Sequence, residues 1–164
     1  MGELTTEETS AFHVAPWMHV IEAGGGAPLD EVLPASGRVH VARLNGKDMV
    51  DEVATFQQFS ESLKFPEYFG WNWNSFYDCL RDLEWLSSDY CILIVDSADE
   101  VLSDDDDARK EFFSALWRAG KQRSYTKRPE GVTLSTISIV LSCSEKSSST
   151  LAGQLGELQE SLTS

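Results

Sequence analysis

Hydrophobic residues form three strand-like segments, separated by segments in which they recur at helical spacing. Residues 38–45 (RVHVARLN) alternate apolar side chains between the two sides of an extended chain, and an Asn-Gly turn follows. Residues 90–95 (YCILIV) are continuously apolar, as in a strand that is covered on both faces. A third apolar run, TLSTISIVLSC, occupies residues 133–143. These three segments are the predicted strands.

Three helices are predicted between the strands. Residues 51–64 carry apolar side chains at helical spacing, and the helix stops before a proline, because the residue that precedes proline avoids the helical conformation. Asn72 or Asn74 caps a second helix. A third helix covers residues 104–120, with acidic residues in its first turn and Gly120 as its C-terminal stop. This alternation predicts an α/β fold with a small parallel sheet packed with helices.

The two ends of the chain lie outside this pattern. We divide the chain into an N-terminal extension (1–37), a central domain (38–143) and a C-terminal segment (144–164). Within the extension, residues 16–23 (PWMHVIEA) are a candidate extra strand before the flexible glycine-rich break AGGGAP. The C-terminal segment begins as a Ser-rich linker and then repeats leucines at helical spacing: Leu151, Leu155, Leu158 and Leu162. The sequence leaves open whether this helix docks or frays.

Charge is distributed unevenly along the chain. The 164 residues carry a net charge of -14, and residues 66–107 hold 12 acidic residues against one basic residue. Residues 108–130 reverse this balance, with seven basic residues and two acidic ones. An acidic surface repels nucleic-acid phosphates and attracts basic proteins, so we expect a basic protein partner rather than nucleic acid. Lys121 to Arg128 are predicted to form a basic loop, either a salt-bridge partner of the acidic region or a nucleic-acid contact.

The sequence disfavours several other classes of protein. Cys79, Cys91 and Cys143 form no CxxC pair, so no zinc site or disulfide framework is predicted, and Cys91 and Cys143 are expected to be buried thiols. No Walker-type glycine loop is present, and we predict no cofactor and no small-molecule substrate. No apolar run is long enough to span a bilayer, and the first residues do not resemble a signal peptide. We therefore expect a cytoplasmic protein.

The segment between residues 66 and 83 combines aromatic and acidic side chains. On a helix over its second half, an apolar stripe faces the core, and Asn74, Asp78 and Asp82 form a polar line on the other side. Tyr77 lies at the border between these faces. The preceding loop adds three rings, at least one of which we expect on the surface: Tyr68, Phe69 and Trp71. Rings around a charged centre are typical of a binding hot spot, although most acidic helix faces contact only water.

The segment PEYFGWNWNSFYDCL (residues 66–80) resembles the signature of the barstar family of intracellular ribonuclease inhibitors. In that family, a Pro-Glu-Tyr-aromatic-Gly loop leads through an Asn into a helix that ends in Asp-Cys-Leu. The order of predicted strands and helices agrees over residues 38–143. The resemblance implies a three-stranded parallel sheet packed with helices. It also implies that the protein blocks the basic active site of a secreted barnase-like ribonuclease or toxin nuclease domain, as a bacterial immunity protein or antitoxin does.

The resemblance further implies roles for single residues. Tyr68 and Asn72 match loop residues that contact the nuclease, and Asp78 matches the aspartate whose carboxylate occupies its phosphate site. Tyr77 stands where the family has a contacting Trp, and Asn74 stands where it has an Asp, which removes one charge.

Other positions depart from the family's pattern. Trp71 and Trp73 replace smaller or charged side chains, and a contacting glutamate on the next helix is missing, because Ser114 or Ala115 falls nearest its place. No catalytic or metal-binding residue is predicted. The predicted partner-binding residues are Tyr68, Trp71, Asn72, Asn74, Tyr77, Asp78 and Asp82.

Two alternatives remain, and the inhibitor hypothesis carries a requirement. Asp78 and Asp82 on adjacent turns could form a carboxylate pair for acid–base catalysis, although no histidine falls beside them by spacing. A barstar-like fold could also bind a partner without inhibiting a ribonuclease, which the departures at Asn74 and Tyr77 permit. The inhibitor hypothesis requires that the Asp78 carboxylate is neither buried under its own chain nor paired with an internal Arg or Lys.

Overall fold

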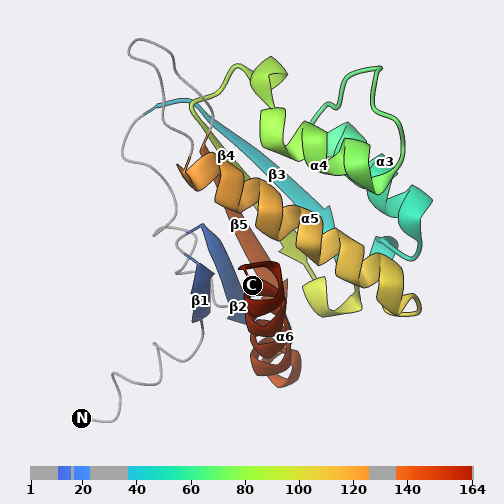
Figure 1. Cartoon of the computed structure of the whole chain (residues 1–164), viewed down its shortest axis with the longest axis vertical. Coiled ribbons are helices and arrows are strands. Elements are labelled where there is room, and N and C mark those ends of the chain that lie inside the picture. Colours follow the sequence, from blue (N-terminus) through green and yellow to red (C-terminus); the bar gives the residue numbers. More distant parts are fainter. Residues whose placement is uncertain (1–10, 16, 23–36, 126–135, 164) are drawn as a thin grey trace.

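The computed structural model describes residues 11–15, 17–22, 37–125 and 136–163, which form an α/β fold (Figure 1). The main elements, in chain order, are β1 (Ala11–Ala15), β2 (Met18–Glu22), β3 (Val39–Asn45), α3 (Glu52–Ser62), α4 (Trp73–Asp82), β4 (Tyr90–Asp96), α5 (Asp106–Tyr125), β5 (Thr136–Cys143) and α6 (Glu145–Thr163). Short 3-10 helices span Gly46–Asp48, Glu84–Leu86 and Ala98–Glu100. The predicted strands and helices of the central domain are all present. The predicted glycine-rich break lies outside the described residues.

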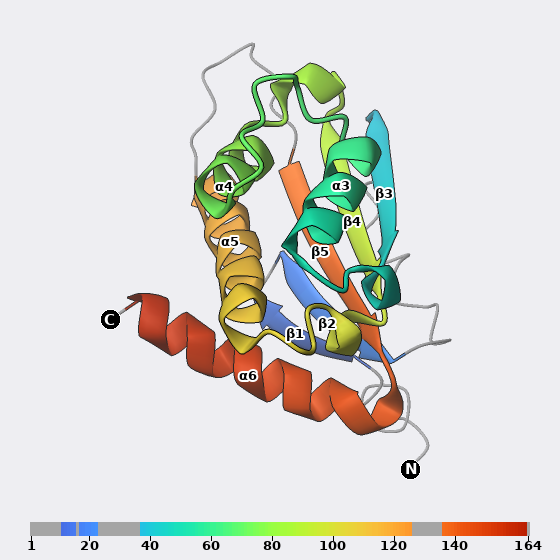
Figure 2. The ribbon, with the colours of Figure 1, turned by 90° about the vertical axis from the view of Figure 1, so that its right-hand side faces the viewer.

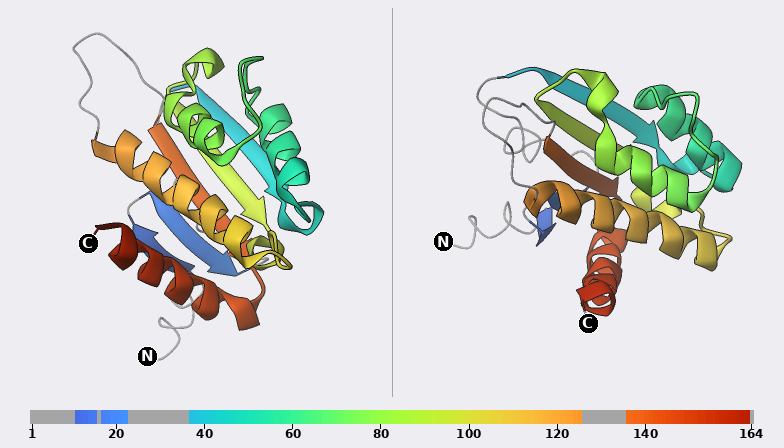
Figure 3. Two further views of the ribbon diagram at one scale, coloured as in Figure 1. Left: turned by 45° about the vertical axis from the view of Figure 1, so that its right-hand side comes forward. Right: turned by 45° about the horizontal axis from the view of Figure 1, so that its top comes forward.

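Within the described residues, the sheet has five strands in the order β1-β2-β5-β4-β3, of which all but β1 run parallel (Figure 3). The expected total of three strands is therefore wrong, although β3, β4 and β5 are the strands that the sequence predicted. The candidate strand of the N-terminal extension forms β2, which pairs with β5 from Met18 opposite Ile139 to Glu22 opposite Cys143. It thereby covers a sheet edge that would otherwise be unpaired. The antiparallel β1 was not predicted, because its short sequence AFHVA carries too little pattern.

Helices α3, α4, α5 and α6 lie along one face of this sheet (Figures 1 and 2). Helix α3 packs on β3, α5 packs on β5 and on α4, and α6 packs beside β1 and β2. Ala42 and Leu44 point from β3 into the core under the helices, whereas Val41 and Arg43 are exposed, which confirms the predicted alternation. On the opposite face, Arg43 pairs with Asp96 of β4 at 2.7 Å.

Helix α5 continues past Gly120 to Tyr125, so the predicted stop at Gly120 is wrong. This glycine is required by packing instead, because a Cβ at Gly120 would clash with the ring of Trp17. The Trp17 ring also packs against Trp117, with 4.7 Å between the ring centroids. The first part of the basic segment, to Tyr125, is consequently helical rather than a loop, and its remainder lies outside the described residues.

The C-terminal segment forms α6 and docks on the domain, which decides the question that the sequence left open. Leu151 and Leu155 are buried in the main core, and Leu158 is partly buried against it. The Ser-rich stretch that we predicted as a linker forms the first turns of this helix. There, the buried Ser148 donates from its hydroxyl to the carbonyl of Glu145 at 3.1 Å. The division of the chain into a domain and two extensions stays a prediction. Residues of both predicted extensions are buried in the same core as the central domain.

Candidate functional site

Helix α4 begins where the sequence predicts, because Asn72 caps it. The Asn72 Oδ1 accepts a hydrogen bond from the N–H of Ser75 at 2.8 Å, and its Nδ2 donates to the carbonyl of Gly70 at 3.1 Å. The Gly70 N–H donates to the Ser75 hydroxyl at 2.8 Å. These bonds fasten the preceding loop to the helix. Both polar groups of the Asn72 side chain therefore have a structural role, and its contact with a partner stays a prediction.

The inner side of α4 packs in a cluster of aromatic rings, as its apolar stripe predicts. Phe76 is buried, and its ring centroid lies 4.8 Å from that of Phe59 in α3 and 6.2 Å from that of Phe112 in α5. Trp73 in the first turn is half-buried and donates from Nε1 to the Glu52 carboxylate at 2.5 Å. Contacts on two sides hold α4 rigidly, which favours the precise presentation of side chains on its outer face.

The outer side of α4 carries the predicted polar line. Asn74 and Asp78 are exposed, and Asp82 is partly exposed. The Asp78 side chain is 61% exposed, so the chain does not bury its carboxylate. However, Nη2 of Arg81 donates to Oδ1 of Asp78 at 3.2 Å. The inhibitor hypothesis requires an Asp78 carboxylate that is neither buried nor paired with a cation of its own chain. The carboxylate is exposed, but it is paired with Arg81.

The ion pair between Asp78 and Arg81 is a surface pair. Arg81 is 47% exposed, and its partner lies three residues earlier on the same helix. Pairs of this kind contribute about 0–1 kcal/mol, because water screens the charges and two side chains lose freedom. Cations of a binding partner could therefore displace Arg81 from Asp78 at small cost.

Tyr77 lies at the border of the two faces, as predicted, and two arginines lie over its ring. The guanidinium carbon of Arg81 is 5.3 Å from the ring centroid, and that of Arg118 in α5 is 4.5 Å from it. Both are cation–π contacts, and they hold two positive charges at Tyr77, the residue before Asp78. The predicted acidic face thus has a basic part that sequence reasoning missed. A signal existed for Arg81, which follows Asp78 at i+3, but Arg118 comes from another helix.

The C-terminal end of α4 is stabilised by Arg123 of α5. Its Nη1 donates to the carbonyl oxygens of Arg81 at 2.6 Å and Asp82 at 2.8 Å. A cation on these last carbonyls also complements the helix dipole. Leu83 adopts a left-handed conformation and ends the helix. Arg123, within the basic segment of α5, therefore contacts the acidic region through these two backbone carbonyls.

The loop before α4 exposes two of its three rings, which confirms that at least one lies on the surface. Tyr68 is 68% exposed and Trp71 is 50% exposed, whereas Phe69 is buried. The ring centroid of Trp71 lies 5.4 Å from that of Phe69. The backbone of Trp71 has a φ of 56°, which falls in the region that favours glycine. The contact of Tyr68 and Trp71 with a partner stays a prediction.

An acidic groove of about 600 Å³ lies at the N-terminal end of α4. It is lined by Glu52, Asn72, Trp73, Asn74, Asp105, Asp107, Ala108, Lys110 and Glu111. Asn74 therefore shares this groove with carboxylates of α3, of α5 and of the residue before α5, and itself lacks the charge of the aspartate that the resemblance implies. Ser114 is half-buried and Ala115 is buried, whereas Glu111, one turn earlier, lines the groove. This arrangement joins three segments, so the sequence alone did not predict it.

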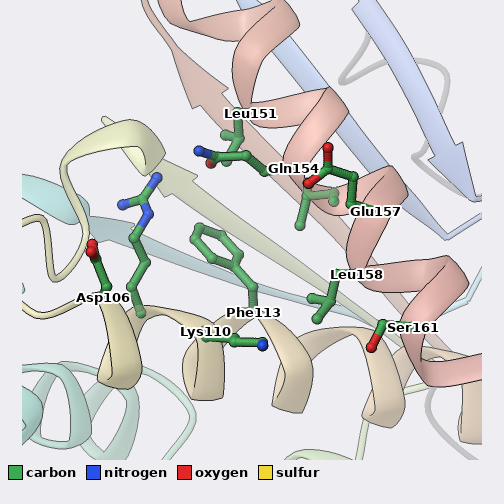
Figure 4. Close-up of a pocket in the computed structure, with 10 residues that line it drawn as sticks. Asp106, Lys110, Phe113, Leu151, Gln154, Glu157, Leu158 and Ser161 are labelled. Carbon is green, nitrogen blue, oxygen red and sulfur yellow. The ribbon is translucent and has the colours of Figure 1, made fainter.

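A second depression, of about 420 Å³, lies between α5 and α6 (Figure 4). Phe113 points from α5 toward α6, and Leu151 and Leu158 project from α6 (Figure 4). Its rim mixes charges of both signs, from Lys110 on α5 and Glu157 on α6. None of the predicted binding residues lines this depression.

The described residues offer little support for a metal site or a cysteine nucleophile. They contain no group of three or more His, Cys, Asp or Glu side chains that could hold a metal ion. Cys79, Cys91 and Cys143 are all buried, which confirms the prediction for Cys91 and Cys143. Burial raises the pKa of the Cys79 and Cys143 thiols to about 11 and that of Cys91 to about 12, and thiols of this kind react slowly.

The histidine in β3 also has a structural contact. Nε2 of His40 lies 3.0 Å from the carbonyl oxygen of Ser62 at the end of α3. In the part of the chain that the structure describes, no helix is both long and apolar enough to cross a membrane.

The family described as "Barstar (barnase inhibitor)" has a model that matches residues 39–135. The matched stretch contains β3, α3, α4, β4 and α5, together with the whole α4 site and the acidic groove. It does not include β1, β2, β5 or α6. No curated protein matches the chain.

Proposed function

The chain belongs to the barstar family, and from this premise we propose that it is an intracellular inhibitor of a secreted barnase-like ribonuclease or a toxin nuclease domain. In this proposal, α4 and the loop before it cover the active site of the nuclease. The partner-binding residues are the seven that the sequence singled out: Tyr68, Trp71, Asn72, Asn74, Tyr77, Asp78 and Asp82. The protein itself catalyses no reaction.

The exposed Asp78 carboxylate on a rigid helix is the observation that carries this proposal. A ribonuclease must gather cationic side chains around the phosphate of RNA, so its empty site is strongly positive. A carboxylate placed there can accept charge-assisted hydrogen bonds from the same donors that bind phosphate. The net charge of -14 also favours rapid encounter with a basic enzyme, because complementary fields steer association.

Exposed rings in the loop before α4 supply the remaining contact. Tyr68 and Trp71 lie in the loop that Asn72 fastens to α4, so their backbone is fixed relative to Asp78. Large rings add contact area at small conformational cost, since each has few rotatable bonds. The acidic groove beside Asn74 offers carboxylates for a further basic side chain of the nuclease.

The proposal is tested by titrating the purified protein against a barnase-type ribonuclease and measuring RNA cleavage and binding affinity. We expect the native protein to stop cleavage at a one-to-one ratio. Asp78→Ala should weaken binding by about 2–5 kcal/mol, because it leaves cations of the nuclease buried without a partner. Calorimetry measures this loss directly.

Asp82→Ala is the matched control, because it removes the same charge one turn away on the same helix. We expect this variant to lose far less affinity than Asp78→Ala. Equal and small losses for the two variants would show that α4 is not the interface.

A binding module without ribonuclease inhibition is the second candidate function. The pairing of Asp78 with Arg81 favours it, since a carboxylate meant to replace phosphate is here partly neutralised. A pull-down of nuclease domains followed by an RNA cleavage assay separates the two functions. A complex that still cleaves RNA would support the binding module and contradict the inhibitor.

A further inference from the structure

The outer face of the α4–α5 pair is bipolar. Near the N-terminal ends of both helices lies the acidic groove, with carboxylates such as Glu52 and Glu111. Toward the C-terminal ends lie Arg81 and Arg118, both exposed and both over the ring of Tyr77. Asp78 lies where the two parts meet, paired with Arg81. We call Arg81, Tyr77 and Arg118 the arginine stack.

The arginine stack is held in place by the protein. Arg118 lies 4.5 Å from the Tyr77 centroid and Arg81 lies 5.3 Å from it, so the ring orients both arginines even where partner cations replace the weak bond between Arg81 and Asp78. Among the residues that the structure describes, no ion pair to a carboxylate is formed by Arg118. Positive charges that are fixed before binding lose little freedom when a partner engages them. Their location within the proposed interface therefore calls for a matching negative group.

A partner surface bearing only cations would fit this face poorly. The cations that approach Asp78 would also approach Arg81, and like charges at close range in an interface cost binding affinity. Such repulsion is a common source of specificity, because it rejects partners with the wrong charge pattern. The partner that fits best presents a carboxylate directly beside its phosphate-binding cations.

We propose that the arginine stack binds an acidic side chain of the target nuclease, and that this side chain is the carboxylate general base of its active site. Cleavage of RNA without a metal needs a base to take the proton of the attacking hydroxyl, close to the cations that hold the phosphate. Asp78 then binds the cations while Arg81, supported by Arg118, binds the base. This inference rests on the proposed function and narrows the target to nucleases with a carboxylate base.

A double-mutant cycle tests this inference. Its components are the native protein, Arg81→Ala and Arg118→Ala, each measured by calorimetry against a ribonuclease whose general base is a glutamate and against its Glu→Gln variant. We expect Arg81→Ala to weaken binding to the unmodified nuclease at least about tenfold, and Arg118→Ala to weaken it less. Against the Glu→Gln nuclease, the effect of Arg81→Ala should largely disappear. Binding, not inhibition, is the measured quantity, since the Glu→Gln nuclease lacks its base.

Arg43→Ala is the control for total charge, because it removes one exposed arginine on the opposite face of the sheet. It should leave the affinity nearly unchanged. If the native protein binds and inhibits the nuclease but Arg81→Ala binds equally or more tightly, this inference is wrong and the proposed function stands. If the native protein neither binds nor inhibits, the proposed function fails and this inference fails with it.

Discussion

Helix α5 separates two sides of the molecule that differ in what they expose. On one side, α3 and α4 pack their rings inward and leave charged groups and the rings of Tyr68 and Trp71 facing solvent. On the other side, Met18 of β2 and Leu155 of α6 are buried, and so is Trp17 just before β2. The family model covers the first side and stops short of the second. We call them the recognition side and the extension side.

The two sides nevertheless share one core. Phe76 on the inner side of α4 and Trp17 just before β2 belong to the same cluster of buried residues, to which α5 also contributes. Side chains on the extension side therefore pack in the same core as the inner side of α4. We expect the whole domain to unfold as one cooperative unit, as small domains with a single core commonly do.

Replacing Trp17 should have the largest effect on stability. Trp17→Ala removes a buried ring that packs on Trp117 and on the backbone of Gly120, so it should lower the free energy of unfolding by about 3–5 kcal/mol. Urea unfolding, followed by far-UV circular dichroism and by tryptophan fluorescence, measures this loss. Transitions that separate for the two signals would show that the extension side unfolds alone.

Alanine at Gly120 gives an independent check on the same contact. Gly120→Ala places a Cβ about where the Trp17 ring lies, so it should destabilise the protein by about 1–3 kcal/mol or more. In the double variant with Trp17→Ala, much of this cost should disappear, because the clash is gone. Gly153→Ala is the matched control: this glycine of α6 has nothing within 4 Å of its added Cβ, so alanine should stabilise by about 0.5–1 kcal/mol.

The recognition side was largely predictable because its signals are local. A cap at Asn72 and apolar spacing determine α4, and each requires only neighbouring residues. The extension side depends on distant partners. β2 is stabilised by pairing with β5, which is far away in the sequence. Gly120 was predicted to end α5, but it is needed for its close contact with Trp17. The sequence alone does not distinguish a glycine needed for such a contact from one that ends a helix.

The same distinction explains what sequence reasoning missed in the site. The polar line and the exposed rings follow from spacing within one helix and its loop. The charges from α5 do not, because Arg118, Arg123 and Glu111 approach α4 only through the fold. Arg81 is the exception, because its i+3 spacing from Asp78 on one helix already permits an ion pair.

The two sides can be compared directly through one buried thiol on each. Cys79 lies on the inner face of α4, and Cys143 ends β5 just before α6. Burial raises both pKa values from 9.0 to about 11, which lowers the thiolate fraction at pH 8 about a hundredfold. Both should react with iodoacetamide at least that much more slowly than in the unfolded chain, at similar rates. Mass spectrometry of the labelled peptides measures each rate, and faster labelling of Cys143 would show that the extension side opens first.

Because of these two thiols, the free energy of unfolding should decrease at alkaline pH. Their pKa values are higher in the folded state than in the unfolded state, so the folded state disfavours the thiolate. Their stabilising contribution is therefore complete below about pH 9 and is lost as the pH rises through 11. Urea unfolding at pH 8 and pH 10 should show the decrease, and replacing both cysteines with alanine should make it smaller.

The smallest expected effect concerns the cap on the recognition side. Asn72→Ala removes the hydrogen bond to the Ser75 N–H and the bond to the Gly70 carbonyl, so the free energy of unfolding should fall by about 1 kcal/mol. Asn72→Asp should keep the cap to Ser75 but lose the donor to Gly70, which isolates the contribution of the loop. If Asn72 acts only as a cap, the nuclease affinity of Asn72→Asp should stay close to that of the native protein. A large loss of affinity with little loss of stability would instead place the side chain in the interface, as the family resemblance implies, and would show that one residue both fastens the loop and contacts the partner.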